Sequence, residues 1–233
     1  MKLTVFIGCF NEKATIAKAI EEAKALKIDK EIIVIDNCST DGTRELLKSL
    51  KEDEELRLVF HEKNMGIGYS SREAVILAKG DYFFGPGADL EYKMQDVYKM
   101  LEKMENEKLD VVFGSRLLER KNASLLSLIK ERPYWLGTLI STSLLNVLYS
   151  RNFTDLIGIH LIKTNVQRVL DCKGSGPVYA FELLSKLYKY GYKLGEVSIE
   201  YKPRTHKEGK TIKASDMLPA IWMIFKIKFF GKR

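Results

Sequence analysis

Five short clusters of polar residues carry the side chains that could bind a ligand in this chain. They are Asn11–Glu12, Asp36–Asn37, the segment 64–68, Asp89 and Ser115–Arg116. Each cluster follows a short apolar run, which places all five at the ends of predicted strands. Carboxylates can hold divalent cations and arginine can bind phosphate, so the residue types suit a polar, anionic ligand.

The elements that position these clusters alternate along the first half of the chain. Strands are predicted at 2–8, 31–36, 56–60, 81–85 and 109–114, and helices at 14–26, 41–50, 69–78 and 93–104. Continuous apolar strands between helices predict an α/β fold of the Rossmann-like kind, with a mostly parallel sheet buried on both faces by flanking helices. Ligands of such sheets bind beyond the carboxyl ends of the strands, which is where the clusters fall.

The second half has a different character. Residues 117–132 are polar and predicted to be irregular, and the uncharged stretch 133–149 predicts a buried or interfacial helix that is too short to span a membrane. A strand near 157–162, a helix over 178–190, a strand over 193–199 and a basic loop follow. A last helix begins after Asp216 and is predicted to be amphipathic, basic and rich in aromatic residues, as in helices that lie in a membrane interface.

The net charge of +7 is concentrated at the end of the chain of 233 residues. Residues 202–233 hold nine Lys or Arg and two acids, so the first 201 residues are neutral overall. A local basic segment favours a local anionic partner, which can be a substrate phosphate, a membrane surface or nucleic acid. The acidic residues at the strand ends argue against nucleic acid as the partner.

Several functional classes are disfavoured by motifs that the sequence lacks. The cysteines, Cys9, Cys38 and Cys172, form no CxxC pair, which argues against a disulfide scaffold or a zinc site and fits a reducing compartment. No GxGxxG follows the first strand and no GxxxxGK[ST] occurs, so an ordinary dinucleotide domain and a P-loop are not expected. The apolar start runs directly into Asn11 without a cleavage site and is interpreted as a strand, not a signal peptide.

The motifs together resemble family 2 glycosyltransferases. The resemblance is carried by FNE at 10–12, EIIVIDNCSTDGT at 31–43, NMGIGYSSREAVILAKGD at 64–81, GADLEY at 87–92 and DVVFGSR at 110–116, and by FELLSKLYKYGYKLGEVSIEY at 181–201 with PRTHKEGKTI at 203–212. The chain looks like the GT-A-fold branch with dolichol-phosphate mannose synthase and bacterial polyprenyl-phosphate glycosyltransferases. This implies one GT-A-like domain, with a nucleotide-sugar-binding half at 1–116 and an acceptor-side half at 117–233.

The resemblance also implies roles for individual residues in an inverting transfer from a nucleoside diphosphate sugar. The implied catalytic residues are Asp89, Glu91 and Arg116. The implied nucleotide-binding residues are Phe10, Asn11, Glu12, Asp36, Gly68 and Ala88, with Glu12 accepting from ribose hydroxyls and Asp36 facing the base or ribose. The implied acceptor or phosphate ligands are Arg132, Arg204 and Lys210.

A divalent cation, Mg²⁺ or Mn²⁺, is implied on the diphosphate. The charge that develops on a diphosphate leaving group needs a cation or cationic side chains. Asp89 stands in the slot of the family's DxD motif, but the first Asp of that motif is Gly87 here. Glu91 is therefore the second candidate metal ligand, because Mg²⁺ takes few protein carboxylates and keeps phosphate and water ligands.

The remaining hypotheses differ in the group that accepts the sugar. A polyprenyl phosphate is already an anion, so its transfer needs no strong base. The basic loop favours this acceptor. The enzyme would then work at the cytoplasmic face of a membrane as a peripheral protein. A saccharide hydroxyl in polysaccharide assembly would need a carboxylate base, for which Asp89, Glu91 and Glu182 are candidates. The alternative from another class is a degenerate protein that binds a nucleotide sugar without turnover, which Gly87 favours.

Overall fold

The computed structural model describes residues 2–120, 127–128, 135–176, 178–204 and 217–231. Two residues of the predicted phosphate set, Arg132 and Lys210, lie outside the described residues. The basic loop that follows Arg204 lies outside them as well.

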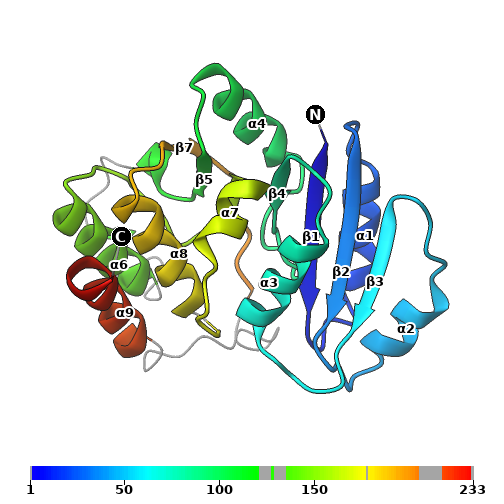
Figure 1. Ribbon diagram of the computed structural model, residues 1–233. Coiled ribbons are helices and arrows are strands. Elements are labelled where there is room, and N and C mark those ends of the chain that lie inside the picture. The colour runs from blue at the N-terminus through cyan, green and yellow to red at the C-terminus, as the bar shows by residue number, and fades with distance from the viewer. Residues whose placement is uncertain (1, 121–126, 129–134, 177, 205–216, 232–233) are drawn as a thin grey trace.

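Seven strands and eight α-helices form the described part of the chain (Figure 1). The strands are β1 (Leu3–Cys9), β2 (Lys30–Asp36), β3 (Leu56–Phe60), β4 (Tyr82–Phe84), β5 (Val111–Ser115), β6 (His160–Lys163) and β7 (Leu194–Ser198). The helices are α1 (Ile16–Lys24), α2 (Thr43–Ser49), α3 (Ile67–Leu77), α4 (Asp96–Asn106), α6 (Trp135–Tyr149), α7 (Thr164–Leu170), α8 (Val178–Lys189) and α9 (Met217–Phe230), with a 3₁₀ turn at Leu118–Arg120.

The strands form one mixed, mostly parallel sheet in the order β3-β2-β1-β4-β6-β5-β7. Pairing is parallel from β3 through β4 and between β5 and β7, while β6 is antiparallel to both of its neighbours. The predicted α/β class is confirmed. The insertion of β6 between β4 and β5 was not predicted, because strand order depends on long-range pairing and not on local pattern.

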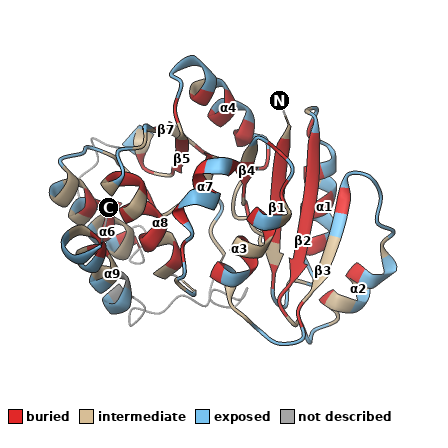
Figure 2. Cartoon of the chain, in the orientation of Figure 1, coloured by how far each residue is buried: buried red, intermediate tan, exposed pale blue. Residues whose placement is uncertain are grey.

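Figure 2 shows that β1 and β2 are buried along most of their length. Successive side chains of these strands enter two different cores, which explains the continuous apolar runs. Val5 and Ile32 point into a core that is closed by α1, α2 and α4. Phe6 and Ile33 point into a second core that is closed by α3, α6, α7, α8 and α9. Helices therefore cover both faces of the sheet.

Strands from both predicted halves pair within this one sheet. β6 and β7 come after residue 116, yet they pair with β4 and β5. The boundary at residue 116 stays a prediction. The short helix α7, which directly follows β6, was not predicted, because its seven residues are too few for a clear helical period.

The last helix differs from the amphipathic helix predicted. Ile224 and Ile227 of α9 are buried, and α9 packs against α8 and α6. Its outward side is also apolar, because Leu218, Trp222 and Phe229 are 74%, 63% and 61% exposed. None of the helices in the described ranges has the length and hydropathy needed to cross a bilayer.

Candidate active site

A cleft of about 790 Å³ opens beyond the carboxyl ends of β1 and β4. Its lining comes from the turn after β1, the turn after β2, the loop after β4 and the segment after β7: Asn11, Glu12, Lys13, Ala14, Thr15, Asp41, Asp89 and Arg204. The structure therefore brings together four residues that were predicted from distant motifs, Asn11, Glu12, Asp89 and Arg204. Phe10 is next to this lining in the chain and is 45% exposed.

Arg204 is the central cation of the cleft. Its guanidinium donates to both carboxylate oxygens of Glu12, at 3.0 and 2.6 Å, and to the Thr15 hydroxyl at 3.2 Å. Its Nε donates to the backbone carbonyl of Asp89 at 3.0 Å. Burial acts to lower the pKa of Arg204, but the hydrogen bonds and charge of Glu12 outweigh burial and raise it, so the side chain is a permanent cation.

Asp89 is the carboxyl group whose protonation is most relevant to chemistry in the cleft. Burial raises the pKa of Asp89 to about 6. The negative charges of Glu91 and Glu12 also raise this pKa, whereas the positive charge of Arg204 lowers it. Its Oδ1 accepts the backbone N–H of Glu91 at 3.2 Å, and its Oδ2 accepts no hydrogen bond from the described residues. Asp89 therefore has a free oxygen in an environment that penalises its charge.

The turns after β1 and β2 hold each other through side-chain caps. Asp41 accepts from the backbone N–H of Lys13 at 3.1 Å and of Thr43 at 3.0 Å, and the Thr43 hydroxyl accepts from the Glu12 backbone N–H at 2.9 Å. Burial would raise the pKa of Asp41, but the bonds from Thr43 and Lys13 outweigh burial and lower it. Lys13, Thr15, Asp41 and Thr43 were not predicted as site residues, although Asp41 and Thr43 lie in the motif at 31–43 and Lys13 follows the motif at 10–12.

Glu91, the second predicted metal ligand, is hydrogen-bonded to the segment after β7 in the structure. Glu91 Oε2 accepts from the Tyr201 hydroxyl at 3.0 Å, and Oε1 accepts from the Arg204 backbone N–H at 2.7 Å. Gly87 has φ +81°, a left-handed conformation that favours glycine. The backbone therefore favours glycine where the family motif has its first acid.

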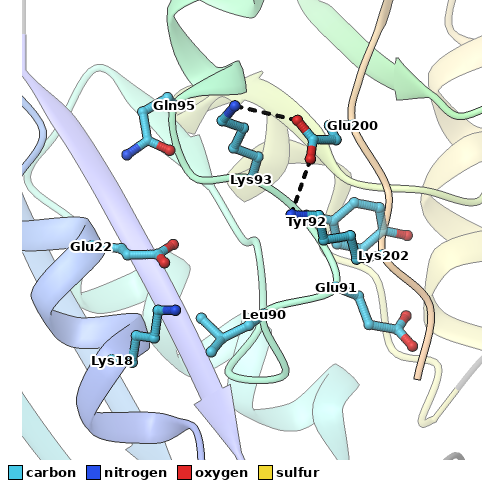
Figure 3. Close-up of a pocket in the computed structure, with 9 residues that line it drawn as sticks. All are labelled: Lys18, Glu22, Leu90, Glu91, Tyr92, Lys93, Gln95, Glu200 and Lys202. Atoms are coloured by element: carbon cyan, nitrogen blue, oxygen red, sulfur yellow. Dashed lines mark hydrogen bonds and ion pairs between the residues drawn. The ribbon is translucent and has the colours of Figure 1, made fainter. Parts of the chain in front are cut away.

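A smaller pocket of about 240 Å³ lies on the other side of this loop, toward α1 (Figure 3). Glu200 forms ion pairs with Lys93 and Lys202, both at 3.2 Å, and Glu91 points away from Lys18 and Glu22. Three of the charged side chains that line this pocket, Lys93, Glu200 and Lys202, are paired at the surface, which is typical of a solvated face. We assign no chemistry to it.

Arg116, which the resemblance implies to be catalytic, is bound to Asp155 in the structure. Its guanidinium forms two hydrogen bonds with Asp155, at 2.6 and 3.0 Å, and lies 5.0 Å from the centre of the Tyr201 ring. The Asp155 side chain is fully buried and that of Arg116 is 9% exposed. Burial acts to lower the pKa of Arg116, but Tyr92 and Asp155 raise it, and the pair joins β5 to the segment that carries Arg204.

Three predicted nucleotide ligands, Asp36, Gly68 and Ala88, are packed against other protein groups in the structure. Asp36 is fully buried and accepts from Arg44 Nε at 2.7 Å, because strand alternation places it on the same face as Ile32, beneath α2. Gly68 packs so closely on the Gly174 carbonyl that a Cβ would lie 2.4 Å from its oxygen. Ala88 is 3% exposed, within the core that α1 and α4 close. The sequence indicated their place at strand ends but not the direction of their side chains.

The donor atoms of the cleft fit a divalent cation with one protein carboxylate. No group of three or more His, Cys, Asp or Glu among the described residues is arranged to hold a metal ion. The cleft lining nevertheless has three acids, Glu12, Asp41 and Asp89, against two bases, Lys13 and Arg204. A diphosphate would add further negative charge, and the free oxygen of Asp89 is suited to Mg²⁺ or Mn²⁺ that takes its other ligands from phosphate and water.

The sheet order and the cleft at the strand ends are those of a GT-A-like α/β fold. The chain belongs to glycosyl transferase family 2, whose family model matches residues 4–162. This confirms the family that the motifs indicated.

Relatives and solved structures of other proteins agree with this class. The chain is 27% identical over 206 residues to the low-salt glycan biosynthesis hexosyltransferase Agl6 of Haloferax volcanii, covering 87% of this chain and 48% of Agl6. It is 30% identical over 125 residues to poly-beta-1,6-N-acetyl-D-glucosamine synthase of Staphylococcus aureus, covering 53% of this chain and 30% of the synthase. The chain thus spans half or less of these two relatives.

The fold is similar to that of glucosyl-3-phosphoglycerate synthase from Mycobacterium tuberculosis. The structure of that enzyme with UDP has a TM-score of 0.68 at 15% identity and covers 97% of this chain and 80% of that one. Its structure with Mn²⁺, UDP and phosphoglyceric acid has a TM-score of 0.65 at 15% identity, covering 99% and 80%. At this level of identity the likeness supports the fold alone.

Proposed function

We propose that this protein is an inverting glycosyltransferase that moves a sugar from a nucleoside diphosphate sugar to a polyprenyl phosphate at a membrane surface. The observation that carries the donor half of the proposal is the meeting of Glu12, Asp89 and Arg204 in one cleft at the strand ends. Acidic and guanidinium groups in one site suit the ribose hydroxyls and the diphosphate of the same ligand.

Each residue has a distinct part in the proposed reaction. Glu12 exchanges its bond to Arg204 for the ribose hydroxyls of the donor, and the released guanidinium then binds phosphate oxygens. Asp89 would hold Mg²⁺ or Mn²⁺ through its free oxygen. When bound, that cation stabilises the charge that develops on the diphosphate as the glycosidic bond breaks. The predicted second metal ligand, Glu91, positions Tyr201 and the Arg204 backbone instead.

The acceptor half of the proposal is supported by α9. We define the apolar surface as Leu218, Trp222, Phe229 and Phe230, all of which are more than 60% exposed. Large exposed apolar groups mark interaction sites, and the interface of a bilayer suits an aromatic-rich helix. Lys226 and Lys228 lie on the same helix, so an anionic leaflet would add attraction of about 1 kcal/mol per basic residue.

Donor binding tests the first half of the proposal. Thermal-shift measurements with UDP-, GDP- and dTDP-sugars, with Mn²⁺ or with EDTA, should show a rise for one nucleotide class that is larger with Mn²⁺. Glu12→Gln should remove most of that rise, while Glu22→Gln, at a surface carboxylate of α1, should leave it unchanged. No response to any donor would contradict the donor proposal and would also exclude a degenerate nucleotide-sugar-binding protein.

The acceptor is tested separately, with the donor identified in that way. We expect transfer to polyprenyl phosphate in vesicles that contain anionic lipid and little transfer to soluble oligosaccharides. The second candidate acceptor is a saccharide hydroxyl, which Asp89 favours because a carboxyl group with a pKa of about 6 can act as a general base near neutral pH. Glu182 is not available for that role, since it accepts from two backbone N–H groups and pairs with Lys186. Efficient transfer to a soluble saccharide would favour this second candidate.

A further inference from the structure

Lys13 lines the cleft together with Arg204, and the two cations differ in their partners. Each side-chain nitrogen of Arg204 already donates to an acceptor: Nε to the Asp89 carbonyl, and the two terminal nitrogens to Glu12. For Lys13 Nζ, the described residues provide no acceptor within hydrogen-bond or ion-pair distance. Within the described lining, Lys13 is therefore the cation that can bind a ligand without first breaking a bond to the protein.

The backbone of Lys13 is fixed by the turn after β2. Its N–H donates to Asp41 Oδ2 at 3.1 Å, while Asp41 Oδ1 accepts from the N–H and the hydroxyl of Thr43, at 3.0 and 2.5 Å. The N–H of Glu12, one position earlier, donates to the Thr43 hydroxyl at 2.9 Å. Asp41 thus holds the turn and the Lys13 backbone together, and its carboxylate forms no ion pair with Lys13 Nζ.

The side chain of Lys13 lies across the same turn, over Gly42. An ideal Cβ at Gly42 would lie 2.9 Å from Lys13 Nζ and 3.1 Å from both its Cδ and its Cε. Gly42 also has φ +97°, a left-handed conformation that favours glycine. The end of Lys13 therefore occupies space that any other residue at position 42 would fill. Because a lysine side chain loses rotamer freedom when it binds a ligand, contact with the turn lowers the entropic cost of binding.

A cation without a counter-charge in a ligand cleft favours an anionic group of the ligand. The acids of the lining are bonded to other protein groups or, at Asp89, suited to a divalent cation. The inference rests on the proposed function, in which the anion that enters the cleft is the diphosphate of the donor. We propose that Lys13 binds a phosphate oxygen of this diphosphate, and that Gly42 positions the Lys13 side chain for that contact.

The two cations of the cleft would bind phosphate at different costs. Arg204 must first exchange its two hydrogen bonds to Glu12, at 3.0 and 2.6 Å, for phosphate oxygens. Lys13 has no such bonds to exchange within the described part of the chain, and its three N–H donors can bind a phosphate oxygen directly. Lys13 should therefore contribute to the affinity for a nucleoside diphosphate and not to the affinity for the nucleoside alone.

Paired ligands with and without the diphosphate test this role. NMR titration at a constant Mg²⁺ concentration compares UDP with uridine, GDP with guanosine and dTDP with thymidine, and it also measures weak nucleoside binding. In Lys13→Gln, affinity for the bound diphosphate should fall about tenfold, while affinity for its nucleoside should change less than about twofold. Lys18→Gln is the matched control and should change neither, because Lys18 is an exposed lysine of α1 that lines the smaller pocket beyond the loop after β4 (Figure 3).

Gly42→Ala tests the positioning role. The added methyl would displace the end of Lys13, so affinity for the diphosphate should fall about fivefold in the natural chain and should not fall further in the Lys13→Gln variant. Gly191→Ala is the control, because Gly191 also has a positive φ of 76° and an added Cβ there would meet nothing within 4 Å. It introduces similar backbone strain away from Lys13 and should leave the affinity unchanged. Equal losses from Gly42→Ala with and without Lys13 would overturn the positioning role.

The outcomes separate this inference from the proposed function. Nucleoside diphosphate binding that is unchanged in Lys13→Gln would overturn the inference and leave the proposed function in place. Equal losses for the diphosphate and the nucleoside would show that Lys13 acts on the base or the ribose, which also overturns it. Inorganic pyrophosphate is the probe that is independent of the donor. Pyrophosphate binding that depends on Lys13, without binding of any nucleotide, would support an anion site at Lys13 and contradict the proposed function. No binding of pyrophosphate or of any nucleotide would contradict both.

Discussion

Two regions of the molecule differ in which side chains have protein partners (Figure 1). One is the rim beyond strands β1, β2 and β4, and the other is the end formed by helices α6, α8 and α9. At the rim, charged side chains are paired with one another, as Glu12 is with Arg204 and Asp36 is with Arg44. At the α9 end, apolar side chains such as Trp222 and Phe230 have no protein partner over most of their surface. These charged groups are thus paired within the protein at one end, while apolar groups are left exposed at the other.

This difference indicates which kind of ligand each region can accept at low cost. A buried charge can exchange one charged partner for another, so the rim suits a ligand that brings hydroxyls and phosphates. An exposed apolar surface gains free energy only when it is removed from water, so α9 suits a hydrocarbon environment. The proposed reaction between a nucleotide sugar and a lipid phosphate would use both regions.

The largest effect is expected at the rim, from Asp89→Asn. Turnover should fall at least about a hundredfold, because the free carboxylate oxygen is lost where transition-state charge must be stabilised. Turnover of the natural protein should also fall as the pH drops through about 6, since Asp89 then takes up a proton. Steady-state kinetics over pH 5–8 measure both effects. Glu102→Gln on α4 is the surface control, and unchanged turnover in Asp89→Asn would contradict the role of Asp89.

The same substitution should act on stability in the opposite direction. Burial raises the pKa of Asp89 from 3.8 to about 6, so the folded chain holds the proton more tightly than the unfolded chain. Its ionisation therefore costs folding free energy: the protonated group's contribution is present below about pH 4 and is lost as the pH rises through about 6. At pH 7.5 we expect Asp89→Asn to raise the free energy of unfolding by about 1 kcal/mol, measured in urea. A loss of stability would show that Asp89 is held by bonds that favour its charge.

The ion pair between Arg116 and Asp155 is tested by Asp155→Asn. This change removes the counter-ion of Arg116, whose pair is buried and joins β5 to Tyr201, and it should lower the free energy of unfolding by about 3 kcal/mol. The control is Asp53→Asn, which breaks an exposed pair with Lys24 and should cost less than about 1 kcal/mol. Urea unfolding of both variants measures the contrast, and equal costs would refute the bridging role.

The role of Gly68 as a packing residue is tested by Gly68→Ala. A Cβ there would lie 2.4 Å from the Gly174 carbonyl oxygen, so α3 or the loop at 174 must shift, at about 2 kcal/mol. Gly85→Ala is the control, because its Cβ would make an ordinary contact of 3.5 Å with Phe6. Thermal unfolding of the two variants compares them. A stable Gly68→Ala protein with weakened nucleotide binding would restore the ligand role predicted from the sequence.

At the α9 end, the test is Trp222→Ser combined with Phe229→Ser. Binding to vesicles that contain anionic lipid should weaken about tenfold or more, since two large apolar side chains no longer enter the interface. The free energy of unfolding should change little, because both side chains are more than 60% exposed. Vesicle sedimentation measures the first and urea unfolding the second. Val169→Ser, at an exposed apolar residue of α7, is the control; unchanged vesicle binding in the double variant would argue for a different partner.

Much of the fold could be predicted because its signals are local. Continuous apolar strands such as 31–36 and the helices between them depend on short-range periodicity, and the ordered motifs placed Glu12 and Asp89 at strand ends that share one rim. The direction of Asp36 could not be predicted, because it depends on which face α2 covers. The hydrogen bonds between Arg204 and Glu12 could not be predicted either, because these residues are 192 positions apart in the chain.

The sequence by itself determined that this protein has an α/β sheet, a row of polar turns at its strand ends and a basic, aromatic-rich last helix. Only the tertiary structure decided which of those polar groups are free. It paired Arg116 with Asp155, committed Glu91 to Tyr201 and left an oxygen of Asp89 open to the cleft. The physical reason is that the state of a charged side chain depends on its nearest counter-charge, and in this protein the counter-charges come from distant parts of the chain.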